Sequence, residues 1–199
     1  MAQPLSRSVR GRYYRRTVLP EGYDLRALRE DDAPALAATY VRNREHLARW
    51  DPVRPGEFYT EAGQLASVRA KLASIEEGRS DTWLLHHGTE VVGQLNINNI
   101  IRGVLQSASI GYFLDRDHLG RGLATRLVEH AVRRAGELGL HRLEAGTIVD
   151  NLPSQGVLQR AGFVHYGTAE RFLFIAGRWQ DHHLYQRILN DDPAGEAVP

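Results

Sequence analysis

A glycine-rich loop that leads into a long amphipathic segment is the first feature of the sequence that could do chemistry. The loop reads Leu119-Gly-Arg-Gly-Leu-Ala-Thr125, and the spacing that follows predicts a helix over Gly122–Leu138. The first turn of a helix has N–H groups without an internal partner and carries partial positive charge. Glycines at that end let the backbone approach a pyrophosphate. The segment therefore predicts a diphosphate site, to which Arg121, Arg126 and Arg160 could add charge-assisted hydrogen bonds.

The loop does not match the best-known phosphate-binding patterns. It is neither the G-x-G-x-x-G of dinucleotide folds nor G-x-x-x-x-G-K-[ST], since no Gly or Lys stands at the required offsets. A glycine pair at a helix start is also a common tight turn. The loop indicates a ligand site only in combination with a second motif.

A second group of polar residues follows the predicted strand Arg142–Val149. It reads Asp150-Asn-Leu-Pro-Ser154 and leads into a short predicted helix over Pro153–Ala161. Asn151 and Ser154 stand three residues apart at the start of this helix, so both side chains are expected at the mouth of the sheet. Asn and Ser usually cap a helix at such a place. The residues by themselves leave a capping role and a chemical role open.

The rest of the sequence predicts the elements that must position these two groups. Apolar residues recur with helical or alternating spacing between Gly- and Pro-containing breaks. Helices are expected over Ala33–Asn43 and Thr60–Glu77. Strands are expected over Tyr23–Leu28, Trp83–His86, Glu90–Ile97, Ser107–Leu114, Phe163–Tyr166, Phe172–Ile175 and His182–Ile188.

Composition favours an ordinary globular protein. The 199 residues are 42% apolar, and the formal net charge of +1 is too balanced to argue for nucleic-acid binding. No apolar run approaches the ~18–20 residues of a membrane-spanning helix. Because there is no cysteine, disulfides, thiolate metal ligands and a cysteine nucleophile are excluded. We expect a cytoplasmic protein that does not bind membranes.

We expect no bound metal ion. The histidine pairs His86-His87 and His182-His183 are the features that could suggest one. Adjacent strand residues point to opposite faces of a sheet, so neither pair can chelate a metal by itself.

The two ends of the chain differ from its centre. Residues 1–20 contain no acid and five arginines: Arg7, Arg10, Arg12, Arg15 and Arg16. This basic extension could bind RNA or an acidic protein, or it could be a frayed or packed terminus. Residues 21–190 are expected to form one domain. Residues 191–199 show no pattern and are expected to be a disordered tail.

The two polar motifs together resemble those of a known family. Leu119–Thr125 resembles the acetyl-CoA pyrophosphate motif of the GNAT superfamily, Q/R-x-x-G-x-G/A, with Gly122 and Ala124 at its small-residue positions. The run Asn151…Ser154…Val157-Leu158…Gly162-Phe163 resembles the N-x-x-S-x-x-V-L-x-x-x-G-F block of the RimJ/RimL-type ribosomal-protein N-terminal acetyltransferases. The motifs occur in the family's order, which makes their conjunction specific.

Two further segments are similar to the same branch: Asn43-Arg-Glu-His-Leu-Ala-Arg-Trp50 and Gly177-Arg-Trp-Gln-Asp-His-His-Leu-Tyr185. The resemblance therefore spans Tyr23–Leu189. One departure is Leu119, which stands where the family usually has Gln or Arg. Its side chain cannot hydrogen-bond to phosphate, but such a loop holds phosphate mainly through backbone N–H groups.

The resemblance implies an α/β (α+β) architecture, the GNAT acyl-CoA N-acyltransferase fold. Its sheet is mixed and mostly antiparallel, with about seven strands, splayed at the cofactor site and flanked by helices. Acetyl-CoA is the implied cosubstrate and CoA the product. The pantetheine arm is expected beside Phe113 and Leu114, where one N–H could stabilise the thioester oxyanion. The other implied cofactor contacts are Leu119, Gly120, Arg121, Gly122, Leu123, Ala124, Thr125, Asn151, Ser154 and Arg160.

The implied reaction is direct attack of a primary amine on the thioester, without a covalent enzyme intermediate. Ser154 matches the family's serine and is our candidate donor to the leaving thiolate, while Asn151 would orient cofactor or substrate. A protein α-amine, with a pKa of ~7.7–8.0, needs less help to become neutral than a lysine at ~10.4. Glu144 and Glu170 are candidate bases, although each could instead be a surface or ion-paired residue.

The acceptor site is expected opposite the cofactor, with candidate wall residues His46, Trp50, Tyr112 and Trp179. The N-terminal α-amine of a protein, such as a ribosomal protein, is the preferred acceptor. A small-molecule, amino-acid or antibiotic N-acetyltransferase is one alternative, and a non-catalytic acyl-CoA-binding or RNA-binding module is another. Monomer and homodimer both remain open.

Overall fold

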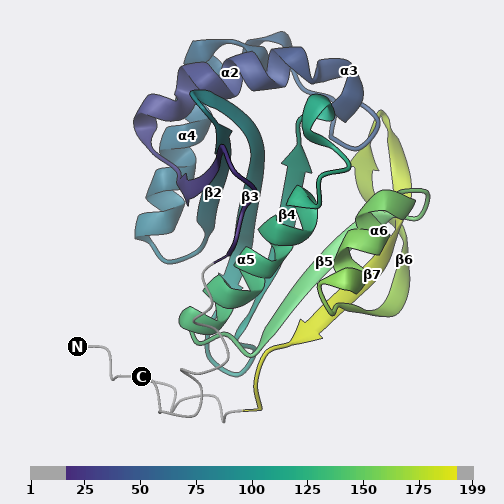
Figure 1. Cartoon of the computed structure of the whole chain (residues 1–199). Helices are drawn as coiled ribbons and strands as arrows, with labels where there is room; N and C mark the ends of the chain where they lie inside the picture. Colours follow the sequence, from purple (N-terminus) through teal and green to yellow (C-terminus); the bar gives the residue numbers. More distant parts are fainter. Residues whose placement is uncertain (1–16, 192–199) are drawn as a thin grey trace.

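The computed structural model describes residues 17–191, and its centre is an open sheet of seven strands in the order β1-β2-β3-β4-β5-β7-β6 (Figure 1). The predictions for residues 1–16 and 192–199 lie outside the described residues. The strands are β1 (Tyr23–Ala27), β2 (Asp81–His87), β3 (Glu90–Ile101), β4 (Ser107–Leu114), β5 (Arg142–Ile148), β6 (Val164–Ile175) and β7 (Arg178–Ile188).

One pair of neighbouring strands differs from all others in this sheet. β4 and β5 are parallel, whereas the other neighbouring pairs are antiparallel. Their pairing covers only Ser107–Ser109 against Arg142–Glu144, although β4 continues to Leu114 and β5 to Ile148. The two strands therefore separate toward their carboxyl ends. A mostly antiparallel sheet of this kind, flanked by helices, confirms the predicted α/β architecture.

Helices cover both faces of the sheet: α2 (Ala33–Arg42), α3 (Arg44–Leu47), α4 (Glu61–Glu76), α5 (Leu123–Glu137) and α6 (Leu152–Arg160). Leu84 and Leu85 are neighbours on β2, yet they are buried in different cores, because successive strand side chains point to opposite faces. One core contains residues of α5 and α6, and the other contains residues of α2 and α4. Figure 1 shows α5 and α6 together on the near face.

Helix α5 connects β4 to β5 and packs against β3, β4 and β5. Apolar residues at helical spacing form its buried side, which includes Leu127, Val128, Ala131 and Ala135. The helix ends where Gly139 adopts a φ of 72°, a left-handed conformation that glycine tolerates. Because its core side is fixed on the sheet, the amino-terminal end of α5 is held where β4 and β5 separate.

The last strands differ from the prediction. The sequence predicts separate strands over Phe163–Tyr166 and Phe172–Ile175, but these residues belong mostly to one strand, β6. Its register against β7 shifts twice, between His165 and Gly167 and between Ala169 and Leu173. Such shifts break the two-residue alternation from which strands are recognised in a sequence. For the same reason the predicted strand His182–Ile188 is shorter than β7, which begins at Arg178.

Candidate active site

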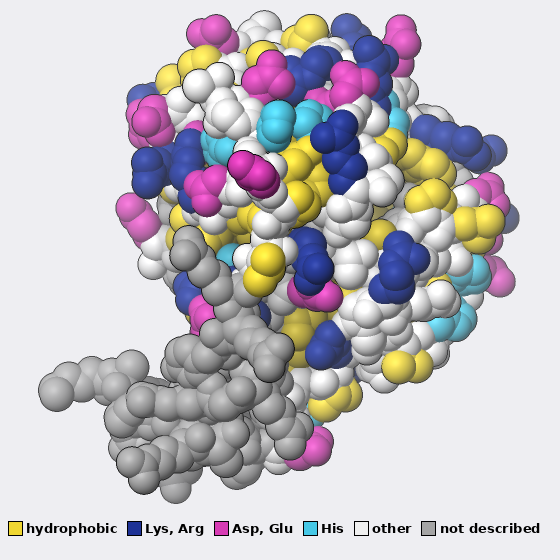
Figure 2. Space-filling model, in the orientation of Figure 1, with side chains coloured by type: hydrophobic (Ala, Val, Ile, Leu, Met, Phe, Trp, Pro, Cys, Tyr) yellow, Lys and Arg dark blue, Asp and Glu magenta, His cyan; other side chains and the backbone are white. Residues whose placement is uncertain are grey.

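The separation of β4 and β5 opens into a cavity of about 1090 Å³. One part of its wall comes from β4, β5, the loop before α5 and the start of α6. Another part comes from α2, α3, the segment after α3 and α4, and includes Tyr40, His46, Trp50, Asp51, Arg54 and Lys71. In Figure 2 apolar side chains gather in the middle of this face of the molecule, with Lys and Arg side chains around them. A cavity of this size is at the upper end of small-molecule sites.

The cavity end of α5 leaves backbone N–H groups available. Gly122 is the N-cap residue, and no side chain caps this helix. Gly120 and Gly122 have φ of 74° and 73°, which side chains with a Cβ rarely adopt. A Cβ at either glycine would meet nothing within 4 Å, so there is open space in front of the loop. This geometry fits a diphosphate on the first-turn amides.

Of the three arginines considered for the phosphates, only Arg160 lines the cavity. Arg121 donates to Tyr23 Oη at 3.0 Å. Arg126 forms an ion pair with Glu129 at 3.1 Å. Arg160 is therefore the guanidinium placed to reach a ligand there, and Arg121 can contribute through its backbone N–H.

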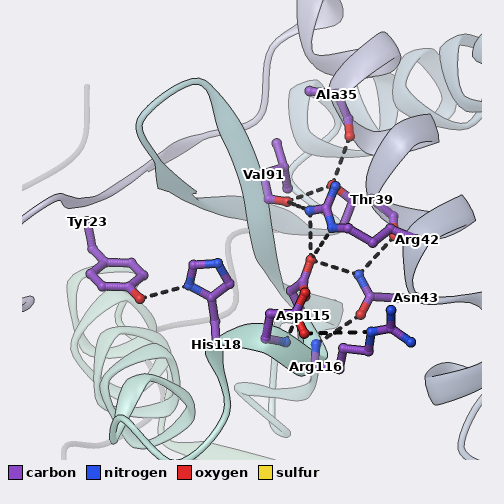
Figure 3. Close-up of polar contacts among 10 residues, drawn as sticks. Tyr23, Ala35, Thr39, Arg42, Asn43, Val91, Asp115, Arg116 and His118 are labelled. Carbon is purple, nitrogen blue, oxygen red and sulfur yellow. Dashed lines mark hydrogen bonds and ion pairs between the residues drawn. The ribbon is translucent and has the colours of Figure 1, made fainter.

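A buried hydrogen-bond network connects the segment just before the glycine-rich loop Leu119–Thr125, called the phosphate loop below, to the end of α2 (Figure 3). Asp115, 1% exposed, accepts hydrogen bonds from Arg42 Nε at 2.7 Å and from Asn43 Nδ2 at 2.9 Å. Asn43 Oδ1 in turn accepts from the backbone N–H of Arg116 at 2.9 Å. Because α3 begins directly after Asn43, this network fixes the loop relative to the other side of the cavity.

The Asp115 carboxyl is held in its charged form. Burial by itself would raise its pKa. Hydrogen bonds from the Asp117 N–H, from Asn43 and from Arg42, together with the charge of Arg42, outweigh burial and lower the pKa. The network therefore keeps its full set of charge-assisted bonds at neutral pH.

Ser154 lines the cavity where β4 and β5 separate, and its hydroxyl group does not cap helix α6. The cap of α6 is Asn151, whose Oδ1 accepts from the Ser154 N–H at 3.2 Å. Ser154 Oγ lies 2.8 Å from Tyr112 Oη, so the pair joins α6 to β4. Burial raises the pKa of Tyr112 to about 12, although the hydrogen bond with Ser154 and the charge of Arg160 act in the opposite direction. Tyr112 is thus protonated at neutral pH and can donate to Ser154, which leaves the Ser154 proton available to a ligand.

Most of the residues predicted to contact the cofactor come together along the cavity wall. Phe113 and Leu114 pair with β3, while the pairing of β4 with β5 ends at Ser109. The β5-facing edge of β4 is therefore without a strand partner at these residues, which suits the amide groups of a pantetheine arm. The predicted cofactor residues in the wall are Phe113, Leu114, Leu119, Gly120, Gly122, Leu123, Ala124, Thr125, Asn151, Ser154 and Arg160.

Three other predicted site residues do not line the cavity. Glu144 accepts a hydrogen bond from Arg142 at 2.6 Å. Glu170 is exposed on β6. Trp179 is 60% exposed, and its ring packs against Phe174. The predicted acceptor residues that do line the cavity are His46, Trp50 and Tyr112.

The cavity wall also contains polar residues that sequence reasoning missed: Asp51, Arg54, Lys71, Asn96, Thr147 and His182. Thr147 Oγ1 is buried and has no hydrogen-bond partner among the described residues, so it can serve a ligand. Lys71 is the chain's only lysine, which was the one available signal in the sequence. His182 belongs to the Gly177–Tyr185 segment, and the remaining residues belong to no motif; only the fold brings them together.

Comparison with known proteins identifies the family of the chain. Residues 24–164 match the family described as an acetyltransferase (GNAT) domain. The chain belongs to the GNAT acetyltransferase family. This GNAT chain is therefore an acyl-CoA-dependent N-acetyltransferase, with acetyl-CoA as its cosubstrate. That assignment removes the non-catalytic alternative.

Individual relatives place the GNAT chain near the RimJ/RimL branch. The probable N-acetyltransferase YjcK of Bacillus subtilis is 36% identical over 175 residues, which are 84% of this chain and 94% of the relative. The ribosomal-protein-S5-alanine acetyltransferase of Vibrio fischeri has a TM-score of 0.83 at 30% identity, covering 87% of this chain and 97% of that one. RimJ of Mycobacterium smegmatis, in complex with CoA-disulfide, has a TM-score of 0.79 at 30% identity, covering 86% and 85%. The predicted resemblance is confirmed.

The described residues fit the cosubstrate of this family. Acetyl-CoA supplies the acetyl thioester when it is bound. The uncapped end of α5, the open space before Gly120 and Gly122, and the unpaired edge of β4 match a diphosphate followed by a chain of amides. Among residues 17–191, no helix is both long and apolar enough to cross a membrane.

Replacing Asp115 should destabilise this GNAT domain. We expect Asp115→Asn to lower the free energy of unfolding at pH 7 by about 2 kcal/mol, since hydrogen bonds to a buried charged group are lost. Because the pKa of Asp115 is lowered in the folded state, its contribution is present above the pKa of an unfolded aspartate. It disappears as pH falls through the folded-state value. Urea unfolding at pH 7 and at acidic pH measures both effects. Glu30→Gln, which breaks an exposed pair with Arg69, should change little.

Replacing Gly122 should strongly weaken cofactor binding. We expect Gly122→Trp to weaken CoA affinity about a hundredfold, because the side chain blocks the loop amides and charge-assisted hydrogen bonds are lost. Gly139→Trp is the matched control, since Gly139 lies at the other end of α5 with nearly the same φ and open space around it. Titration calorimetry with CoA measures the difference. Equal affinities in the two folded variants would contradict the assignment of the loop.

Proposed function

We propose that this GNAT enzyme transfers the acetyl group of acetyl-CoA to the N-terminal α-amine of a protein. The observation that carries the proposal is a single cavity lined both by the phosphate loop and by residues of α3 and α4. One part of it suits the cosubstrate, and the rest provides room for the end of an extended chain. Both partners can therefore be held at the split between β4 and β5, and the amine can attack directly.

Each part of the wall has a role in the proposed reaction. The α5 amides and Arg160 hold the diphosphate, and the free edge of β4 beside Phe113 holds the pantetheine arm. Ser154, supported by Tyr112, would donate a hydrogen bond to the leaving thiolate, and the proton that the attacking amine loses would balance the one that the CoA thiol gains. A thiol has a pKa near ~8.5, so a donor at this place eases the departure of the thiolate.

The cavity favours an α-amine over a lysine amine. Asp51 is the only carboxylate among the residues that line it, because Glu144 and Glu170 lie elsewhere. An α-amine with a pKa of ~7.7–8.0 is already ~10% or more neutral at pH 7, whereas a lysine side chain is almost fully charged. An enzyme with one carboxylate in its cavity wall is suited to the more readily deprotonated amine.

The similarity to a protein-modifying enzyme supports this acceptor. The Vibrio fischeri structure is named for acetylation of an alanine of ribosomal protein S5, and its likeness covers nearly all of that chain. At 30% identity we carry over the chemical class of acceptor, a protein N-terminus, and leave the identity of the protein open.

A panel of acceptors tests the proposal. We expect acetylation at the α-amine of short peptides that begin with a small residue, and much slower acetylation of polyamines and of lysine side chains. Mass spectrometry with fragmentation locates the added acetyl group. The reverse preference, for a small amine over every peptide, would make the chain a small-molecule acetyltransferase on the same fold.

Removing the Ser154 hydroxyl should affect turnover more than binding. We expect Ser154→Ala to lower kcat about tenfold to a hundredfold with acetyl-CoA affinity nearly unchanged, because the donor to the thiolate is lost while the loop contacts remain. Thiol release measures kcat, and calorimetry measures affinity. Tyr112→Phe should show a smaller loss in the same direction. Unchanged turnover in Ser154→Ala would leave Ser154 with a structural role.

A further inference from the structure

Three charged side chains line the cavity on the side formed by α3, α4 and the segment between them. Asp51 follows α3, Arg54 lies three residues later, and Lys71 stands on α4. They belong to no motif of the cofactor site. Since the phosphate loop and the β4 edge occupy the cosubstrate side, these charges face the space that remains for the acceptor.

The Asp51 backbone is fixed from two directions. Its N–H donates to the Leu47 carbonyl at 2.9 Å, and its carbonyl accepts from the Ala176 N–H at 3.2 Å. The second bond joins the segment after α3 to the turn between β6 and β7. The Asp51 carboxylate itself makes no hydrogen bond or ion pair with another described residue. A fixed backbone with an uncommitted carboxylate is suited to receive a ligand.

Lys71 is similarly uncommitted. Among the described residues its ammonium group has no ion-pair or hydrogen-bond partner. Burial and, to a smaller extent, the charge of Arg54 lower the pKa of Lys71 to about 8, against the opposing effect of Asp51. A partly buried cation beside a second cation is unfavourable in the free protein. An anion placed between Lys71 and Arg54 would relieve this cost.

We propose that Asp51, Arg54 and Lys71 form a charged subsite for acceptors that carry a carboxylate close to the reactive amine. Asp51 accepts a hydrogen bond from the amine, and Lys71 and Arg54 bind the carboxylate. Two cations and one carboxylate leave the subsite with excess positive charge, which disfavours basic acceptors. The inference rests on the proposed acetyl transfer to an amine in this cavity. The carboxylate can come from an acidic side chain near a peptide N-terminus or from a free amino acid.

Matched acceptors test the subsite. Hexapeptides that begin with alanine and differ only in a second residue of Glu, Gln or Lys separate charge from size. We expect the Glu peptide to bind the CoA-saturated enzyme about tenfold more tightly than the Gln peptide, as for one charged hydrogen bond, and the Lys peptide to bind more weakly still. Calorimetry measures affinity, and mass spectrometry measures acetylation of the same peptides. Free glutamate and alanine form the amino-acid arm.

Variants assign the preference to particular side chains. Lys71→Met should reduce the Glu-over-Gln preference to less than about threefold, and Lys71→Arg should largely keep it. Arg69→Met is the matched control, because it removes an equal charge from α4 at a residue paired with Glu30 on the surface. Asp51→Asn should weaken both peptides alike, since both carry the amine. Circular dichroism and unchanged CoA affinity verify that each variant is folded.

The outcomes separate the two proposals. Equal affinity for the Glu and Gln peptides, or no binding of either, overturns the subsite if free glutamate also shows no Lys71-dependent preference over alanine. A Lys71-dependent preference in binding without any acetylated peptide supports the subsite and overturns the proposed function. A Lys71-dependent preference seen only with free amino acids supports the subsite and moves the acceptor from a protein terminus to an amino acid.

Discussion

The site depends on the place where one strand pairing ends. β4 and β5 are joined for only three residue pairs, and their backbones then diverge. Two parallel strands that remained paired would satisfy each other's N–H and C=O groups and leave no space between them. Here the edge of β4 beyond Ser109 is left for a ligand, and the cavity follows from the split. The helix that connects the two strands, α5, necessarily has its first turn at the same place.

The second requirement is that the loop keeps its shape while its own N–H groups stay unpaired. A helix end without a side-chain cap gives up stabilisation, and glycines in the left-handed region add little order. Asp115 compensates for this lost stability, because its buried carboxylate accepts hydrogen bonds from Arg42, Asn43 and the Asp117 N–H (Figure 3). The groups that stabilise the loop are thus separate from the groups that are free to bind.

The site residues that could be predicted from the sequence are those that stand in short motifs. Gly120, Gly122 and Ser154 stand in short motifs whose spacing has a direct backbone meaning, and the fold places them at the cavity wall. Glu144 was proposed as a carboxylate on a predicted strand and Trp179 as an aromatic residue near a late strand. Neither lines the cavity, since Glu144 pairs with Arg142 and Trp179 is exposed. The place of Arg121 in a motif likewise did not predict where its side chain lies. Arg121 is part of the loop itself, but its guanidinium donates to Tyr23 Oη, 98 residues away in sequence.

The sequence by itself determined the order of helices and strands, the glycine loop at the start of α5 and the family, because periodicity, capping and φ preferences act over a few residues. It did not determine the double register shift of β6, the Ser154–Tyr112 pair or the meeting of Asp51, Arg54 and Lys71. These depend on contacts between segments far apart in the chain. Such contacts are decided by how the two cores pack, so only the tertiary structure shows which charged and polar side chains share the cavity.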